Sequence, residues 1–238
     1  MRDAPRFHLA GERGLLVELG TRIDPSLSNL ARTLSARIEE WPEVEEAVPS
    51  YAGVLVLYDP LATTMESLRG RIAEAWTALG SKELPPSRTV LLPVAYGGTY
   101  GPDLEAVADH TGFSADEVLR RHASALYLVH LIGFTPGFPY LGGLPPELAT
   151  PRLPTPRTRV PAGSVGIAGS QTGVYSLESP GGWRLIGRTP TLLFDPRRDP
   201  PSLLRAGDRL RFRPLASSDF PLLAEASARG ESTWEEER

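Results

Sequence analysis

The chain has 238 residues, 41% hydrophobic and 23% charged, a composition typical of a globular protein with one large domain or two modest ones. The net charge of −4 argues against a basic nucleic-acid-binding surface, and the absence of cysteine excludes disulfides, a thiol nucleophile and cysteine-ligated zinc. The first residues lack the apolar core of a signal peptide, and no stretch is apolar enough to cross a bilayer, so we expect a cytoplasmic protein without membrane contact.

Lys82 is the only lysine in the chain. A phosphate-binding P-loop needs a lysine directly after a glycine, and Lys82 follows Ser81, so the sequence contains no such motif. Nothing around Lys82 resembles a biotin-carrier lysine, so we expect no biotin on this chain.

Residues 1–82 have the pattern of a small α+β domain. The predicted strands are 7–9, 15–19, 44–48 and 53–58, and the predicted helices run over about 25–41 and 65–79. Asp24 as N-cap and Pro25 at the first helical position mark the start of the first helix. Two hairpins that alternate with two helices predict an antiparallel sheet covered by helices on one side.

The segment from Gly80 to Arg88 is polar and contains two adjacent prolines, which is typical of a linker. We therefore place the domain boundary between residues 82 and 83. The second domain is expected to cover residues 83–216. A tail over 217–238 follows, and its charged residues from Gly230 onward are predicted to be frayed.

The second domain opens with a predicted strand, two helices and a strand, over residues 89–96, 102–111, 114–123 and 125–132. Residues 133–190 then contain 11 glycines and 10 prolines, interleaved with aromatic and branched side chains that disordered segments lack. This density predicts short strands joined by tight turns in a β-barrel. The further strand candidates are 164–168, 173–176, 183–187, 191–194 and 208–212.

A series of motifs from His122 onward resembles a known family. The motifs include Gly133-Phe134-Thr135-Pro136-Gly137-Phe138-Pro139-Tyr140, Arg159-Val160-Pro161-Ala162-Gly163, Gln171-Thr172-Gly173-Val174-Tyr175, Ser179-Pro180-Gly181-Gly182-Trp183 and Ile186-Gly187-Arg188-Thr189-Pro190. Their order resembles the allophanate hydrolase subunit 1 family, which also includes Kip-type inhibitors of sporulation kinases. The resemblance covers essentially the whole chain.

The resemblance implies an N-terminal α/β sandwich of two hairpins and two helices, followed by a cyclophilin-like β-barrel. It also implies the B-subunit role in an ATP-dependent 5-oxoprolinase, which opens 5-oxo-L-proline to L-glutamate with partner A and C subunits. ATP is then used by the complex, and the component that binds it stays open. Two alternatives also stay open, namely an inhibitor of a sensor histidine kinase and a carboxyltransferase-type subunit of urea carboxylase or allophanate hydrolase.

The matching positions give the candidate site residues. His122 and Arg188 are the candidates for catalysis, although His122 could equally be a buried histidine bonded to the backbone. The candidates for binding a substrate or a partner are Phe134, Pro136, Gly137, Phe138, Tyr140, Arg157, Arg159, Gln171, Thr172, Gly181, Gly182 and Trp183.

Each candidate also has a structural explanation. The loop at Pro136 is expected to display three aromatic rings as a pocket wall or partner surface, although its phenylalanines could plug the barrel instead. The arginines Arg157, Arg159 and Arg188 could converge on a carboxylate or phosphate, or could each form a surface ion pair. Trp183 could stack on a ligand or belong to the core. The four histidines have no metal-ligand spacing, so we predict no metal site.

Overall fold

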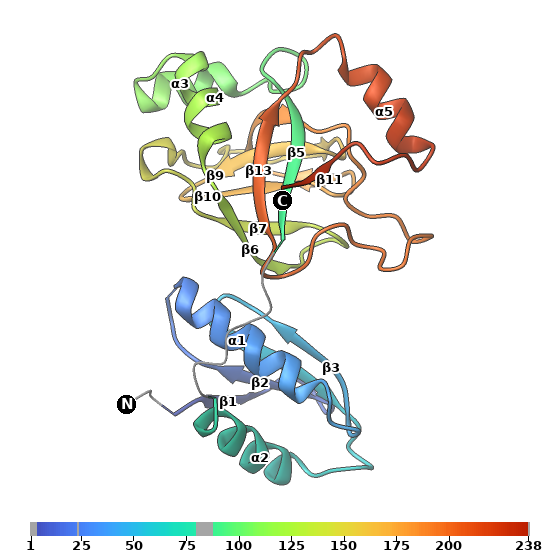
Figure 1. Ribbon diagram of the computed structural model, residues 1–238. Coiled ribbons are helices and arrows are strands. Elements are labelled where there is room, and N and C mark those ends of the chain that lie inside the picture. The colour runs from blue at the N-terminus through green and yellow to red at the C-terminus, as the bar shows by residue number, and fades with distance from the viewer. Residues whose placement is uncertain (1–3, 23, 80–87, 238) are drawn as a thin grey trace. The chain divides into compact units, whose positions relative to one another are not determined.

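The computed structural model describes residues 4–22, 24–79 and 88–237, and the chain separates into two compact units, residues 1–86 and 87–238 (Figure 1). The predicted boundary between residues 82 and 83 lies outside the described residues. In the part of the chain that the structure describes, no helix has the length and apolar character needed to cross a membrane.

The first unit contains four strands and two helices within its described residues. In chain order these are β1 (Arg6–Leu9), β2 (Gly14–Glu18), α1 (Pro25–Ile38), β3 (Val44–Pro49), β4 (Gly53–Tyr58) and α2 (Met65–Thr77). The strands form one antiparallel sheet in the order β1-β2-β4-β3. The predicted pair of hairpins alternating with two helices is confirmed.

Local sequence signals explain where the helices and strands of this unit form and which faces they bury. The carboxylate of Asp24 accepts hydrogen bonds from the backbone N–H groups of Ser26 and Leu27, and Pro25 begins α1. Along β4, Val54 and Val56 are buried and alternate with half-buried residues, so one face of the sheet supplies the core. That core includes apolar side chains of both helices.

The second unit is built around a barrel. Its described elements are β5 (Thr89–Tyr96), α3 (Leu104–Thr111), α4 (Ala115–Ser124), β6 (Tyr127–Ile132), β7 (Pro139–Gly142), the 3₁₀ turn η1 (Pro146–Leu148), β8 (Arg157–Val160), β9 (Ser164–Ala168), β10 (Gln171–Val174), β11 (Ser179–Gly181), β12 (Arg184–Arg188), β13 (Arg209–Pro214), α5 (Phe220–Ala228) and β14 (Glu235–Glu237).

Within these described elements, seven strands close a ring in the order β12-β9-β10-β7-β6-β13-β5, and β12 pairs back with β5. The β5–β13 pair is parallel, while the other pairs in the ring are antiparallel (Figure 1). The α+β class with a C-terminal barrel is therefore confirmed.

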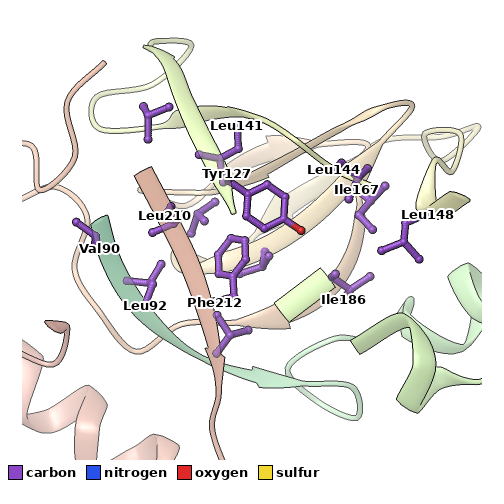
Figure 2. Close-up of a cluster of buried hydrophobic side chains, with 14 of the residues drawn as sticks. Val90, Leu92, Tyr127, Leu141, Leu144, Leu148, Ile167, Ile186, Leu210 and Phe212 are labelled. Carbon is purple, nitrogen blue, oxygen red and sulfur yellow. The ribbon is translucent and has the colours of Figure 1, made fainter. Parts of the chain in front are cut away.

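Apolar side chains from strands around the ring fill the barrel. Figure 2 shows Leu92, Tyr127, Ile167 and Phe212 gathered in this core, and all four are at most 2% exposed. Burying side chains of this size is worth about 1.5–3 kcal/mol each. The barrel therefore gives the loops at its ends a fixed platform.

The expectation that the chain is frayed from Gly230 onward is wrong for Glu235–Glu237. These residues form β14, which pairs with the first half of β5, a stretch that β12 does not cover. Arg213 lies 2.8 Å from Glu235, and Arg211 lies 3.3 Å from Glu237, so charge complementarity adds to the backbone pairing. The charged tail was therefore a poor indicator of fraying.

The predicted strand over residues 191–194 is also wrong, because only Phe194 pairs, in an isolated bridge with Ser202, and side chains bond to neighbouring backbone groups. The N–H of Leu192 donates to Ser227 Oγ at 3.0 Å, and the carbonyl of Leu193 accepts from Arg198 at 3.1 Å. Conversely, the end of the loop predicted over residues 134–140 is part of strand β7. Pro139 is its first residue, where a strand tolerates a missing N–H.

Candidate functional site

The tip of the β6–β7 hairpin holds the backbone in a strained conformation. The N–H of Gly133 donates to the carbonyl of Phe138 at 3.0 Å, which closes the loop. Inside it, the N–H of Thr135 donates to the carbonyl of Gly133 at 2.8 Å, and Phe134 between them has φ of 64°. This is a γ-turn with positive central φ, which is rare for a residue with a side chain and costs about 1–3 kcal/mol.

The second half of the loop is a tight turn fixed from the neighbouring loop. The N–H of Phe138 donates to the carbonyl of Thr135 at 3.0 Å, with Pro136 and Gly137 as the central residues. Gly137 has φ of 75°, the conformation that a type II turn requires after proline. Ser176 Oγ donates to the carbonyl of Pro136 at 2.6 Å. The strained tip is therefore held on a rigid support.

Only one of the three rings expected on this loop is displayed. Phe134 is 67% exposed, whereas Phe138 is 2% exposed and Tyr140 lies half-buried in β7. The expectation that the loop displays all three rings is therefore wrong, because Phe138, directly before β7, packs against Tyr175 and Trp183, and Tyr140 in β7 packs against the same cluster. The edge contact of Phe134 with Phe138, with centroids 5.7 Å apart, links the exposed ring to the core.

Phe138 is the centre of a buried aromatic cluster. Its ring centroid lies 5.0 Å from Tyr140, 5.4 Å from Tyr175 and 5.7 Å from Trp183. Trp183 is 6% exposed, so it belongs to the core rather than to a ligand-stacking surface. A side chain at Gly181 would overlap the Tyr175 ring, so glycine there is needed for packing. Burial raises the pKa of Tyr175. Gly182 accepts a backbone bond from Leu153 at 2.7 Å.

His122 lies in a buried hydrogen-bonded chain. Thr172 Oγ1 donates to the carbonyl of Gly166 at 2.9 Å, so it accepts from Nε2–H of His122 at 3.0 Å. The imidazole is then unprotonated at Nδ1, which accepts from the hydroxyl of Tyr96 at 2.9 Å. The carbonyl of His122 accepts from Tyr127 at 2.8 Å. These bonds join α4 to β5, β6 and β10.

The surroundings of His122 favour the neutral imidazole. The side chain is fully buried, and burial lowers its pKa to about 3. Its ring stacks on Phe212 with centroids 4.7 Å apart. Of the two explanations left open by the sequence, the geometry fits a buried structural histidine, with a side-chain rather than a backbone partner on each nitrogen. Thr172 is also fully buried in this chain, whereas its neighbour Gln171 is half-buried on β10.

The three candidate arginines have separate partners. Arg157 lies 2.7 Å from Asp103, whose other oxygen accepts from the N–H of Leu185 at 2.7 Å. Arg159 is 76% exposed and lies 2.7 Å from Glu178. Arg188 donates through Nε to the carbonyl of Ala162 at 2.8 Å.

The candidate catalytic residues His122 and Arg188 also share no partner. The guanidinium carbon of Arg188 lies 5.6 Å from the ring centroid of Phe220, whereas the side-chain partners of His122 are Tyr96 and Thr172. Catalytic roles for these two residues therefore stay predictions. Among the described residues, no group of three or more histidine, cysteine, aspartate or glutamate side chains is arranged to hold a metal ion.

Comparisons with known proteins identify the family. The family model for the carboxyltransferase domain, subdomain C and D, matches residues 5–204. The B subunit of 5-oxoprolinase from Escherichia coli O157:H7 is 45% identical over 210 residues, which cover 88% of this chain and 95% of the relative. The protein of the same name from Bacillus subtilis (strain 168) is 38% identical over 229 residues, which cover 91% of this chain and 95% of the relative. This chain belongs to the family of 5-oxoprolinase B subunits.

The family resemblance expected from the motifs is thus confirmed. Among solved structures, this 5-oxoprolinase B-subunit homologue resembles the crystal structure of TTHA0988, with 39% sequence identity and a TM-score of 0.75. The match covers 86% of this chain and 40% of that chain. More than half of the solved chain therefore lies outside the part that resembles this protein.

Three residues that position the candidate site of this B-subunit homologue were missed in the sequence. Tyr96 completes the His122 chain, Asp103 anchors Arg157, and Ser176 fixes the loop of Phe134. Asp103 falls at the start of the helix predicted over residues 102–111 and is the N-cap residue of the observed α3, although its carboxylate bonds elsewhere. Tyr96 and Ser176 carry no sequence signal, because their partners are 26 and 40 residues away in the chain.

Proposed function

We propose that this chain is the B subunit of an ATP-dependent 5-oxoprolinase and acts only together with partner A and C subunits. The observation that carries the proposal is the 45% identity to the B subunit of a 5-oxoprolinase over 95% of that relative's length. A match of this extent covers both units of the chain rather than one shared domain. The use of ATP supports a cytoplasmic reaction.

The reaction opens a five-membered lactam. The amide nitrogen of 5-oxo-L-proline is a poor leaving group, and transfer of a phosphoryl group from ATP to the amide oxygen activates the carbonyl carbon. Attack by water breaks the carbon–nitrogen bond, the nitrogen becomes the amino group of L-glutamate, and phosphate and ADP are released. This chain has no P-loop, which supports a nucleotide site on a partner subunit.

The exposed Phe134 ring is the proposed contact with the C subunit. An aromatic side chain on a rigid, strained turn supplies contact area with little loss of conformational entropy on binding. Strain of this kind persists where function requires the conformation. TTHA0988 supports the idea of a neighbouring polypeptide, because 40% of that chain corresponds to this protein and the remainder is additional sequence.

The experiment combines this chain with A and C homologues encoded in the same genome. We expect the chain to co-elute with the C homologue in size-exclusion chromatography, and the three-component mixture to release glutamate and ADP from 5-oxo-L-proline and ATP. This chain alone is expected to release neither product. Independent elution of all three proteins, together with no turnover, would refute the proposal.

A further inference from the structure

A cavity of about 490 Å³ lies beside the barrel, and none of its lining residues belongs to the candidate site described above. One wall is the loop after β12, and the other runs from the end of α5 toward β14. The lining residues fall within 191–198 and 227–234. The volume is within the range of about 300–1,000 Å³ that small-molecule sites occupy.

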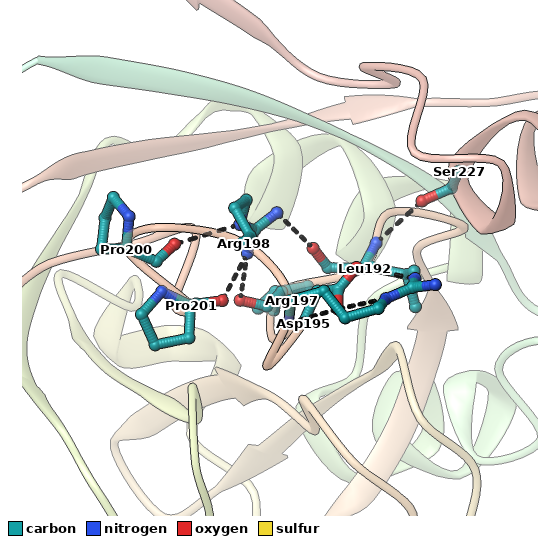
Figure 3. Close-up of polar contacts among 8 residues, drawn as sticks. Leu192, Asp195, Arg197, Arg198, Pro200, Pro201 and Ser227 are labelled. Atoms are coloured by element: carbon teal, nitrogen blue, oxygen red, sulfur yellow. Dashed lines mark hydrogen bonds and ion pairs between the residues drawn. The ribbon is translucent and has the colours of Figure 1, made fainter.

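Hydrogen bonds hold the first wall in place. Figure 3 shows the guanidinium of Arg198 among backbone carbonyl groups, where it donates to Pro201 at 2.8 Å and Pro200 at 3.3 Å. Across the cavity, Ser227 on α5 accepts from the N–H of Leu192. The hydroxyl groups of Thr191 and Thr233 lie 2.8 Å apart, which joins the same two walls. The cavity is therefore largely preformed.

The lining carries both signs of charge, with one positive charge in excess. Arg197 is paired with Asp195 at 2.9 Å, and Arg229 is paired with Glu231 at 2.7 Å. Arg198 donates to backbone carbonyl groups, which carry no net charge and therefore do not neutralise the guanidinium. The neighbouring guanidinium groups hold the pKa of the Asp195 carboxyl well below its usual range. The electrostatics therefore favour an anion that carries a single charge.

The rest of the lining is suited to an apolar or planar group. Trp234 and Leu192 both line the cavity, and Trp234 also packs against the barrel core. Arg88, outside the cavity lining, lies over the Trp234 ring with its guanidinium carbon 5.5 Å from the centroid, so the part of the indole turned away from Arg88 is the flat apolar surface open to a ligand. A carboxylate can pair with the guanidinium groups while the body of the molecule lies on the indole.

We propose that this cavity binds a small molecule with one carboxylate and a compact, partly apolar body, of about the size of an amino acid. The cavity and the charge of its ligand are argued from the lining alone, whereas the choice of 5-oxo-L-proline and L-glutamate as ligands rests on the proposed function. Two classes of molecule fit this chemistry, namely a lactam acid without an ammonium group and a free amino acid. Their difference is that the ammonium group of an amino acid could also pair with Asp195 or Glu231.

The test titrates the full-length chain with 5-oxo-L-proline, L-glutamate, acetate and inorganic phosphate in separate arms. Binding is followed by the NMR signal of the Trp234 indole N–H and by hydrogen exchange of residues 227–234. We expect 5-oxo-L-proline or L-glutamate to shift the indole signal in a saturable manner and to protect this segment. Acetate is expected to bind at least ten-fold more weakly, because it lacks the body that contacts Trp234.

Charge variants make the test specific. Combining Arg197→Gln with Arg229→Gln removes two positive charges and is expected to weaken binding at least ten-fold. Glu231→Gln releases Arg229 from its partner and is expected to tighten binding of 5-oxo-L-proline several-fold. Arg120→Gln is the matched control, since Arg120 is 72% exposed and ion-paired on α4, outside the cavity lining.

The outcomes are separable from those of the reconstitution experiment, because no turnover is measured. Saturable binding of either organic acid, with the affinity changes expected for the charge variants, supports the proposal. Preference for one acid identifies the class of ligand. A Trp234 signal that responds only to phosphate, or to no probe, overturns it. Binding that is equally strong in the double arginine variant and in the Arg120 control overturns it as well. Glu231→Gln keeps the test decisive where the double variant fails to fold.

Discussion

The Nε2 atom of His122 on α4 lies 3.0 Å from Oγ1 of Thr172 on β10, inside the closed barrel. Because the hydroxyl of Thr172 donates its hydrogen bond to the carbonyl of Gly166, the direction of each hydrogen bond in the chain is determined. A helix outside the ring is thus fastened to strands within it by a neutral histidine, and the first two predictions concern this bond.

Replacing Thr172 with valine is expected to lower the free energy of unfolding by about 1–3 kcal/mol, because valine leaves the buried Nε2–H of His122 without an acceptor. Thr172→Ser keeps the hydroxyl and is expected to lose less, mainly through the missing methyl group. Urea unfolding of both variants gives the comparison. Equal losses in the two variants would mean that the packing of Thr172, rather than its hydrogen bond to His122, accounts for its contribution to stability.

The buried His122 is expected to make the fold sensitive to acid. Its pKa is about 3 in the folded protein and about 6.5 when exposed in the unfolded chain. Below pH 6.5 the unfolded chain therefore takes up a proton that the folded protein does not. The free energy of unfolding then falls by up to about 1.4 kcal/mol per pH unit until the pH approaches the folded pKa.

The imidazole ¹⁵N signals of His122 between pH 7 and pH 4 check this account. We expect the neutral form with the proton on Nε2 throughout that range. A His122 signal that titrates near pH 6.5 in the folded protein would contradict both the burial argument and the assigned tautomer.

The γ-turn at Phe134 gives opposite expectations for stability and for assembly. Phe134→Gly removes the positive-φ strain and is expected to change the free energy of unfolding by no more than about 1 kcal/mol, because relief of strain offsets the added chain entropy. Phe134→Ala keeps the strain and loses the edge contact with Phe138, so it is expected to be the less stable of the two.

Both variants remove the exposed ring, so both are expected to weaken binding to the C subunit at least ten-fold. Isothermal titration with the C homologue measures this. Leu222→Ala on α5 is a suitable control, since Leu222 is equally exposed at 67%. Unchanged affinity in both Phe134 variants would show that the partner binds elsewhere.

The Asp103–Arg157 pair is expected to matter more than the Arg159–Glu178 pair. Asp103 is buried and also accepts the N–H of Leu185, so Asp103→Ala leaves a guanidinium and a backbone donor without their partner. We expect a loss of about 2 kcal/mol, moderated by the partial exposure of Arg157. Glu178→Ala removes an exposed partner and is expected to cost within about 0.5 kcal/mol. Thermal unfolding of the two variants separates these effects.

Much of the fold could be predicted because local signals agree with it. The cap at Asp24, the alternation along β4 and the glycine-rich turns each specify an element through neighbouring residues. The strand predicted at residues 191–194 failed because only Phe194 forms a β-bridge there, while the N–H of Leu192 bonds to Ser227, which lies 35 residues away. No periodicity in a short segment can reveal such a distant partner.

The candidate site was less predictable than the fold. Motifs marked Phe134 and Phe138 alike, yet one ring is exposed and the other is buried, because the loop ends where strand β7 begins. Exposure of this kind depends on the register of a hairpin rather than on residue type. The cavity beside α5 had no sequence signal, since its two walls come from segments about 30 residues apart.

The central claim is that this chain is a required, non-autonomous subunit of a 5-oxoprolinase. Its most direct test is to add the chain in increments to a fixed amount of the A and C homologues and to measure glutamate formed from 5-oxo-L-proline and ATP. We predict negligible glutamate without the chain and a rate that rises to a plateau as the chain becomes equimolar with its partners. Glutamate formation at the same rate with and without the chain would contradict the claim.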